Sequence, residues 1–339
     1  MINRVYRLIA PKQIQMSFTN IDLTTQDVIV RPKHLSICAA DQRYFQGLRS
    51  PDAMRKKLPM ALIHECCAEV VHDAKGVFKP GQKVLLVPNE PTAPAGLIRD
   101  NYAETSRFRA SGYDGFMQEY VSIVHECVVP YENIDDSIAS ICELISVAMH
   151  SVTTFMNTAH AKRDSIAVYG DGNLGYIVAL LLKSLMPQTK LHIMGIVDEK
   201  LALFSFADEV HHTDQIPEGL RVDHAFECVG GQASGIAVNS IIDIINPQGT
   251  IMLMGVSEQP IPINTRMVLE RGLTIIGRSR STTKDFEDTR DLLESNPDIQ
   301  SRLKRIVREI VPVHNISDMT EAFNDDFSNP YKTVMKWLV

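Results

Sequence analysis

The stretch Ser165–Gly175, SIAVYGDGNLG, decides the fold of this 339-residue chain. It begins as an apolar run typical of a buried strand, and the glycines that follow open an apolar segment, residues 174–185, with the composition of a helix. A strand, a G-x-G-x-x-G turn and a helix form the unit that binds the pyrophosphate of a dinucleotide. A glycine-rich turn without a ligand is the alternative. We predict that the cofactor contacts Gly170, Gly172, Asn173, Leu174 and Gly175.

The residues that follow alternate between strand-like and helix-like patterns. Such alternation predicts a parallel sheet covered by helices on both faces. We therefore expect a doubly wound α/β domain over residues 143–285. Its expected strands after the first are 191–194, 224–228, 250–254 and 273–276, and a further helix is expected over 237–245.

The rest of the chain predicts a second, β-rich domain. Residues 1–142 contain short β-type runs separated by Gly and Pro turns, which favours a barrel-like unit. Residues 286–339 have mixed character, with an expected helix at 318–323 and a final strand at 333–338. The polar, proline-containing stretch from about 89 to 112 is expected to form an extended lobe.

Composition excludes several classes of protein. Apolar residues make up 45% of the chain and the net charge is −7, which argues against non-specific binding of nucleic acid. The N-terminus MINRVYRLIA lacks the apolar core of a signal peptide, and no run approaches the ~20 apolar residues of a membrane span. The six cysteines show no framework spacing, so free thiols in a reducing compartment are expected. We predict a cytoplasmic protein.

The end of the second strand of the α/β domain bears on the choice of dinucleotide. An acidic residue there would bind the 2′-hydroxyl of NAD. The strand instead ends at Gly195, and Asp198 and Glu199 come too late. A 2′-phosphate is therefore tolerated, and Lys200 is placed to pair with it. We predict NADP(H); a solvated Lys200 and use of either cofactor is the alternative.

Four residues of the β-rich part and its border are suitable ligands for one metal ion. Cys38, His64, Glu65 and Glu143 offer a thiolate, an imidazole and two carboxylates. One thiolate, one imidazole and one carboxylate suit a tetrahedral zinc with an open fourth position. Separately, Cys38 is as readily explained as a small buried apolar residue, and His64 as a hydrogen-bonded core histidine.

The order of these motifs resembles that of the zinc-containing medium-chain dehydrogenase/reductase family over almost the whole chain. The shared features are Cys-x-x-Asp at 38–41, His-Glu at 64–65, GYDGFMQEY at 112–120, Glu-x-x-Ser-Val at 143–147 and the glycine fingerprint. The resemblance implies a GroES-like β-barrel catalytic domain and a Rossmann dinucleotide-binding domain. It also implies a homodimer, and a zinc held by Cys38, His64 and Glu65 that can exchange Glu65 for Glu143.

Two departures from the family pattern affect the expected chemistry. Many relatives bind a structural zinc through four cysteines in a lobe, whereas residues 89–112 contain no cysteine, so one zinc per chain is expected. Relatives often have a proton-relaying Ser or Thr two residues after the ligand cysteine, where this chain has Ala40. A metal-bound water or Glu143 must then be considered for the proton route.

Basic residues suggest a phosphorylated substrate. Arg43, beside Tyr44, suits bidentate binding of phosphate. Lys56 and Lys57 add charge, although a solvated pair is the simpler interpretation. Arg278 and Arg280 are expected to face either the cofactor or the substrate.

Further stretches resemble the reductases of ribulose 5-phosphate in bacterial teichoic-acid and capsule synthesis, namely residues 36–44, 57–60, 170–175 and 223–231. That resemblance implies reversible reduction of D-ribulose 5-phosphate by NADPH to D-ribitol 5-phosphate, which a cytidylyltransferase would convert to CDP-ribitol. Two alternatives remain open. One is a polyol dehydrogenase acting on an unphosphorylated sugar alcohol, and the other is a non-catalytic NADP(H)-binding redox sensor.

Overall fold

The computed structural model describes residues 1–93 and 96–339. Within it the chain divides into two compact units, residues 1–146 with 280–339 and residues 147–279. From the sequence, these boundaries were expected after residue 142 and before residue 286. No helix among the described residues is long and apolar enough to cross a membrane.

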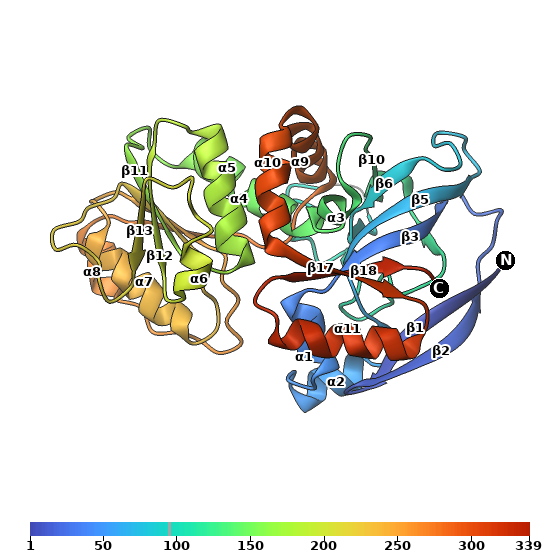
Figure 1. Cartoon of the computed structure of the whole chain (residues 1–339). Helices are drawn as coiled ribbons and strands as arrows, with labels where there is room; N and C mark the ends of the chain where they lie inside the picture. Colours follow the sequence, from blue (N-terminus) through green and yellow to red (C-terminus); the bar gives the residue numbers. More distant parts are fainter. Residues whose placement is uncertain (94–95) are drawn as a thin grey trace. The chain divides into compact units, whose positions relative to one another are not determined.

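The second unit is built on a six-stranded sheet in the order β13-β12-β11-β14-β15-β16, with every pair parallel. Figure 1 labels β11, β12 and β13 of this sheet. Taken along the chain this is the order 3-2-1-4-5-6 of a doubly wound dinucleotide-binding sheet. The sequence predicted this class of sheet and five of its strands, but not β13. The strands are β11 (Ser165–Tyr169), β12 (Lys190–Gly195), β13 (Glu209–His212), β14 (His224–Glu227), β15 (Thr250–Leu253) and β16 (Thr274–Gly277).

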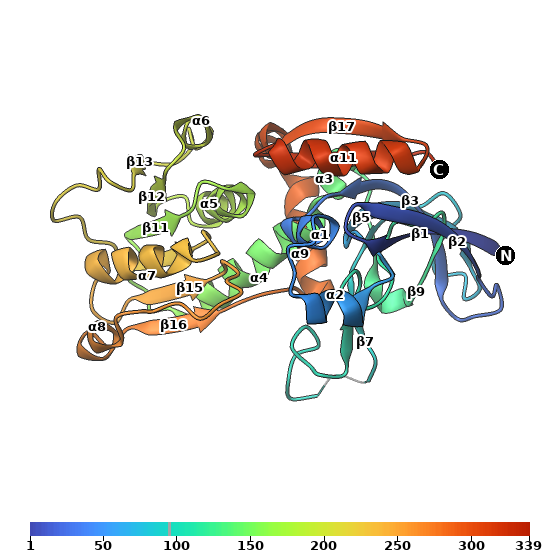
Figure 2. The ribbon, with the colours of Figure 1, turned by 90° about the horizontal axis from the view of Figure 1, so that it is seen from below.

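Helices cover both faces of this sheet, with α5 and α7 on opposite sides of the strands (Figure 2). On one face, Phe155 of α4 meets Phe226 of β14 with ring centroids 5.2 Å apart. On the other, the Tyr169 hydroxyl lies 3.0 Å from that of Ser240 on α7. The helices are α4 (Cys142–Thr158), α5 (Asn173–Leu185), α6 (Asp198–Leu201), α7 (Ala233–Ile244) and α8 (Thr265–Glu270).

A buried histidine in this unit is held in its neutral form. The ring of His224 on β14 donates from Nε2 to the carbonyl of Lys162 at 2.9 Å and accepts at Nδ1 from the amide of Thr250 at 3.1 Å. Because an imidazolium has no acceptor nitrogen, protonation would break the second bond. Burial, helped by the neighbouring His160, lowers the pKa of His224 to about 4.

We therefore expect the free energy of unfolding to decrease at acidic pH, because the buried His224 resists protonation in the folded state. The folded pKa lies below the ordinary value of 6.5, so the unfolded chain binds the proton more readily between pH 6.5 and about 4. The free energy of unfolding should drop by ~3 kcal/mol across that window. His224→Gln should remove this part of the pH dependence in urea unfolding at pH 7 and pH 4.5, and the exposed His314→Gln should keep it. Equal slopes for wild type and His224→Gln would contradict the assignment.

The first unit is β-rich, as the sequence predicts. Its largest sheet runs β10-β6-β5-β3-β18-β17 with β9 added to β3, and smaller sheets are β2-β1-β4 and β7-β8. The strands are β1 (Ile2–Ala10), β2 (Gln13–Asn20), β3 (Val28–Ser36), β4 (Met60–Ala61), β5 (Glu65–Asp73), β6 (Lys83–Leu86), β7 (Asn89–Pro91), β8 (Ser106–Phe108), β9 (Val121–Ile123), β10 (Val128–Pro130), β17 (Val307–Val313) and β18 (Lys332–Trp337).

The C-terminal segment completes this unit. Strand β18 pairs with β3, and the ring of Phe323 on α11 stacks on Phe45 of α1 at 4.5 Å. The helices are α1 (Ala39–Phe45), α2 (Pro51–Lys57), α3 (Asp136–Ala139), α9 (Thr283–Ser295), α10 (Pro297–Leu303) and α11 (Ile316–Ser328), with 3₁₀ turns η1 (His125–Cys127) and η2 (Lys304–Ile306).

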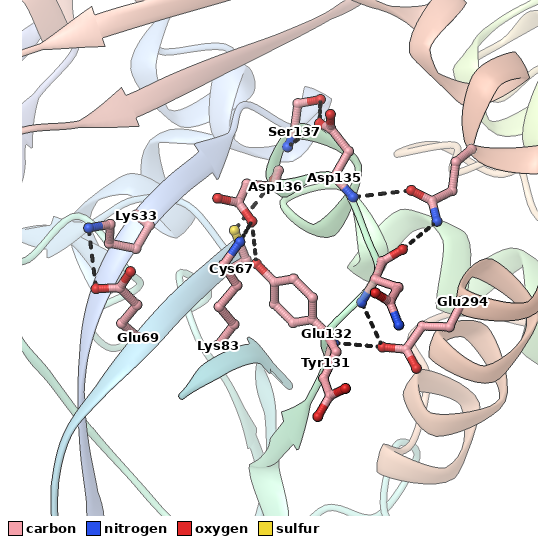
Figure 3. Close-up of polar contacts among 12 residues, drawn as sticks. Lys33, Cys67, Glu69, Lys83, Tyr131, Glu132, Asp135, Asp136, Ser137 and Glu294 are labelled. Atoms are coloured by element: carbon pink, nitrogen blue, oxygen red, sulfur yellow. Dashed lines mark hydrogen bonds and ion pairs between the residues drawn. The ribbon is translucent and has the colours of Figure 1, made fainter. Parts of the chain in front are cut away.

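A polar contact also joins helix α9 to the loop that follows β10 (Figure 3). Glu294 of α9 accepts a hydrogen bond from the amide of Glu132 at 2.7 Å, 162 positions earlier in the chain. Beside it, Asp136 accepts from Lys83 Nζ at 2.8 Å and from the Tyr131 hydroxyl at 3.0 Å. Residues far apart in sequence thus form one unit around the β-rich core.

Candidate metal centre and dinucleotide site

Three of the four predicted metal ligands come together in the first unit. The Cys38 sulfur, a His64 ring nitrogen and a Glu65 carboxylate oxygen all lie within 4.8 Å of one another. Cys38 follows β3 as the N-cap of α1, and Glu65 opens β5, where it is registered against Ser36. Thiolate, imidazole and carboxylate are ligands of tetrahedral zinc, so the donor set fits the ion that the sequence predicts.

Two buried polar atoms in this group also fit a bound cation. His64 Nδ1 and Glu65 Oε2 make no hydrogen bond among the described residues. The backbone before His64 is unusual, because Ile63 is a β-branched residue with a φ of 69°. Backbone strain of this kind costs energy and persists where the surroundings impose it, as they do at functional sites.

Asp41, the last residue of the Cys-x-x-Asp motif, fixes the segments that carry two of the ligands. Its buried carboxylate accepts from the amide of Ile63 at 2.9 Å and from the amide of Cys38 at 3.2 Å. Its Oδ1 lies 3.7 Å from His64 Nδ1. Asp41 is therefore a positioning residue.

Lys332, at the start of β18, lies directly behind Glu65. Its buried Nζ is 2.8 Å from each oxygen of the Glu65 carboxylate and donates to the carbonyl of Ile37 at 2.7 Å. The contact between Nζ and Oε1 is a hydrogen bond. Oε2 makes no hydrogen bond, so its contact with Nζ is an ion pair without hydrogen-bond geometry. Burial lowers the pKa of Lys332, but the charges of Glu65 and Cys38 outweigh it and raise the pKa, which keeps the ammonium charged.

Without a metal, the pKa values of two of the three clustered ligands, Cys38 and His64, are raised. Burial raises the pKa of the Cys38 thiol. Burial would lower the pKa of His64, but the charges of Asp41 and Cys38 raise it well above its ordinary range. Because metal ligands must be deprotonated, binding of zinc here would release protons.

Glu143 does not join the three clustered ligand atoms. It is buried in the first turn of α4, where it feels the charges of His64 and Glu65. Burial, with the added repulsion of Glu65, raises the pKa of Glu143 to about 7. A carboxyl group with this pKa can hold or give up a proton near neutral pH.

Basic side chains gather over α1. Arg43 is half-buried on that helix, and the buried ring of the next residue, Tyr44, lies beneath two cations. The Arg49 guanidinium is 5.0 Å from the centre of the Tyr44 ring, and Lys57 Nζ is 5.9 Å from it. Lys56 is exposed. Arg49, which the sequence analysis did not single out, belongs to this basic group.

The glycines of the second unit have separate steric roles. Gly170 has a φ of 120°, and a Cβ there would lie 2.9 Å from the backbone of Cys228. A Cβ at Gly175 would lie 2.0 Å from the carbonyl oxygen of Gly170. Gly172 is the N-cap of α5, and a Cβ added to it would have no other atom within 4 Å beyond its neighbours in the chain. The turn is tight at its first and third glycines and open at the second, as pyrophosphate binding requires.

Strand β12 ends in Gly195, as predicted, but a carboxylate from elsewhere reaches that point. Asp171 accepts from the amides of Ile196 at 2.7 Å and Val197 at 2.8 Å. A Cβ on Gly195 would lie 2.7 Å from that of Asp171. The middle residue of the first Gly-x-Gly therefore organises the loop after β12, a role that the spacing of the motif did not indicate.

The other predicted basic contacts are placed as follows. Lys200 is half-buried in α6. The Arg278 guanidinium donates from Nε to the Thr154 hydroxyl of α4 at 3.1 Å. Arg280 belongs to the first unit, where its guanidinium lies 3.4 Å from the carbonyl oxygen of Asn101.

Known proteins share both units. Residues 24–133 match the alcohol dehydrogenase GroES-like domain, and residues 203–295 match the zinc-binding dehydrogenase family. The chain is 49% identical to ribulose-5-phosphate reductase 1 of Staphylococcus aureus, with 100% of both chains covered. It is 46% identical to ribulose-5-phosphate reductase of Bacillus spizizenii, with 99% of each covered. The crystal structure of S. aureus TarJ in complex with NADPH is similar over 100% of both chains, with a TM-score of 0.90 and 46% identity.

Proposed function

The chain belongs to the zinc-containing medium-chain dehydrogenase/reductase family, and on that premise we propose that it uses NADPH to reduce D-ribulose 5-phosphate to D-ribitol 5-phosphate. The observation that carries this proposal is the full-length similarity to reductases of ribulose 5-phosphate. The clustered Cys38, His64 and Glu65 support it, because they are the ligands that a zinc-dependent carbonyl reduction needs.

Each group of site residues has a separate proposed role in the reaction. Cys38, His64 and Glu65 would hold a zinc ion, which when bound would supply a Lewis acid for the substrate carbonyl. The turn at Gly170–Gly175 binds the pyrophosphate of NADPH, which supplies the hydride. Ala40 has no hydroxyl, so Glu143, with a pKa of about 7, is the proposed source of the proton for the developing alkoxide.

The same proposal covers the surroundings of the enzyme. All six cysteines are free thiols, which suits a reducing cytoplasm that also supplies NADPH. D-ribitol 5-phosphate would pass to a cytidylyltransferase that makes CDP-ribitol for teichoic acid or capsule. The active form is proposed to be a homodimer.

The substrate phosphate is proposed to bind Arg43. We expect Arg43→Ala to lower kcat/KM for ribulose 5-phosphate about 10²-fold and to change the value for unphosphorylated ribulose by less than about 3-fold, because a charge-assisted bond to phosphate contributes ~1.5–3 kcal/mol. Lys56→Ala, at an exposed lysine, is the control. Equal losses on both substrates would favour a polyol dehydrogenase.

One assay tests the whole proposal. Oxidation of NADPH is followed with ribulose 5-phosphate, xylulose 5-phosphate and ribulose, each with and without a chelator, and is repeated with NADH. We expect the highest kcat/KM with ribulose 5-phosphate and NADPH, and loss of activity when the chelator removes zinc. Tight binding of NADPH without turnover of any substrate would favour a redox sensor.

A further inference from the structure

A second group of metal-ligating side chains lies in the other unit, on the edge of the parallel sheet. His192 of β12 is registered against Glu209 of β13, and His211 follows two positions later on β13. Because alternate residues of a strand point to the same face, the three side chains emerge together. Their ligand atoms all lie within 4.8 Å of one another.

The distances from Glu209 to the two histidines are close to those between ligand atoms in a tetrahedral metal site. Glu209 Oε2 is 3.1 Å from His192 Nδ1 and 3.1 Å from His211 Nε2. Zinc bonds to nitrogen and oxygen are about 2.0–2.1 Å long, so two ligand atoms of a tetrahedral site lie about 3.3–3.4 Å apart. The two separations that involve Glu209 are therefore close to what coordination requires, and the bond from a metal ion to His211 would replace the present hydrogen bond between His211 and Glu209.

His192 supplies independent evidence for a ligand. The residue is 2% exposed, and its Nδ1 makes no hydrogen bond even though Glu209 Oε2 is near. An Nδ1 that carries no proton can donate its electron pair to a metal ion. A buried ring nitrogen without a hydrogen bond is costly, and a metal ion would satisfy it.

We propose that His192, Glu209 and His211 bind a second transition-metal ion of the zinc class. Two imidazoles and a carboxylate form a ligand set used by zinc, with water in the fourth position. His211 and Glu209 are half-buried, so the ion can enter from solvent. The bound ion would link the edge strand β13 to β12. This site is separate from the Cys38 centre and does not depend on the proposed reaction.

Lys190 competes with the metal for Glu209. Its ammonium forms an ion pair with Glu209 Oε1, but half of the Lys190 side chain is exposed and can turn towards water. Lys190→Gln should therefore tighten metal binding at this site several-fold. A weaker affinity in that variant would contradict a role for Glu209 as a ligand.

Cobalt distinguishes the two centres. Metal-free full-length protein is titrated with Co²⁺ while visible absorption is recorded. Ions bound at Cys38 give a thiolate-to-cobalt charge-transfer band, whereas ions bound only by imidazole and carboxylate do not. We expect two equivalents of Co²⁺ to bind, and only one of them to produce that band.

Variants locate the second equivalent. His211→Gln should lose it and keep the charge-transfer band, which also reports that the protein has folded. His212→Gln is the matched control, because His212 is the next residue of β13 but pairs with Asp214. If His211→Gln folds poorly, Glu209→Gln replaces it. The proposal would be overturned if the wild type bound only one equivalent. It would also be overturned if His211→Gln and Glu209→Gln both retained the second equivalent.

Discussion

Replacement of Cys38 by serine is expected to remove the catalytic zinc and to lower kcat/KM about 10³-fold or more. Cys38 supplies the sole thiolate of the cluster, and the hydroxyl of serine is a far weaker zinc ligand. Loss of the ion removes several kcal/mol of stabilisation from the developing alkoxide, and each ~1.4 kcal/mol is a factor of ten in rate. Zinc content by mass spectrometry and NADPH oxidation measure the two effects.

A second buried thiol in the same unit provides the control. Cys127 is completely buried, and its Sγ lies 3.5 Å from the carbonyl oxygen of Asn89. Serine at that position can make the same hydrogen bond, so Cys127→Ser should keep both zinc and activity. The proposed centre would be wrong if Cys38→Ser kept wild-type zinc content and turnover.

The sequence predicted those parts of the molecule whose structure depends on residues close together in the chain. The fingerprint at 170–175 predicted the dinucleotide turn because each glycine acts on its immediate neighbours, the backbone of Cys228 among them. The barrel was predicted from short runs with regular turns. The assignment of Cys38, His64 and Glu65 as zinc ligands depended on resemblance to a family, since Cys38 and His64 taken alone are readily explained as core residues.

Residues that act over long sequence separations were missed. Lys332 reaches Glu65 across 267 positions, and no spacing pattern records a contact of that length. The second metal cluster depends on the register between β12 and β13, and the sequence analysis did not predict β13. Asp171 occupies the unspecified position of the first Gly-x-Gly, although its carboxylate holds the loop after β12. Their roles follow from strand order and register, which a single sequence leaves open.

Replacement of Lys332 by methionine is expected to destabilise the zinc-free protein by ~3–5 kcal/mol. The variant keeps most of the buried side-chain volume but leaves the Glu65 carboxylate, which is completely buried, without its cation. Removing one partner of a buried ion pair costs this much because the other charge stays in a medium of low polarity. Urea unfolding of chelator-treated wild type and variant measures the difference.

The same substitution should strengthen zinc binding. In the wild type Lys332 neutralises Glu65 and competes with the metal for its oxygens, both of which lie 2.8 Å from Nζ. With methionine at 332 the lysine no longer competes with zinc for Glu65, so competition with a chelator should show a higher affinity. The zinc-loaded variant should accordingly recover part of the lost stability.

A double variant separates the loss of the ion pair from a simple packing defect. Lys332→Met combined with Glu65→Gln removes both charges, so most of the lost free energy of unfolding should return to the zinc-free protein. Glu65→Gln also removes a zinc ligand, and the gain in zinc affinity should vanish. Equal stability of the single and double variants would instead mean that methionine packs badly at 332. In that case the charge of Lys332 would not control the position of Glu65.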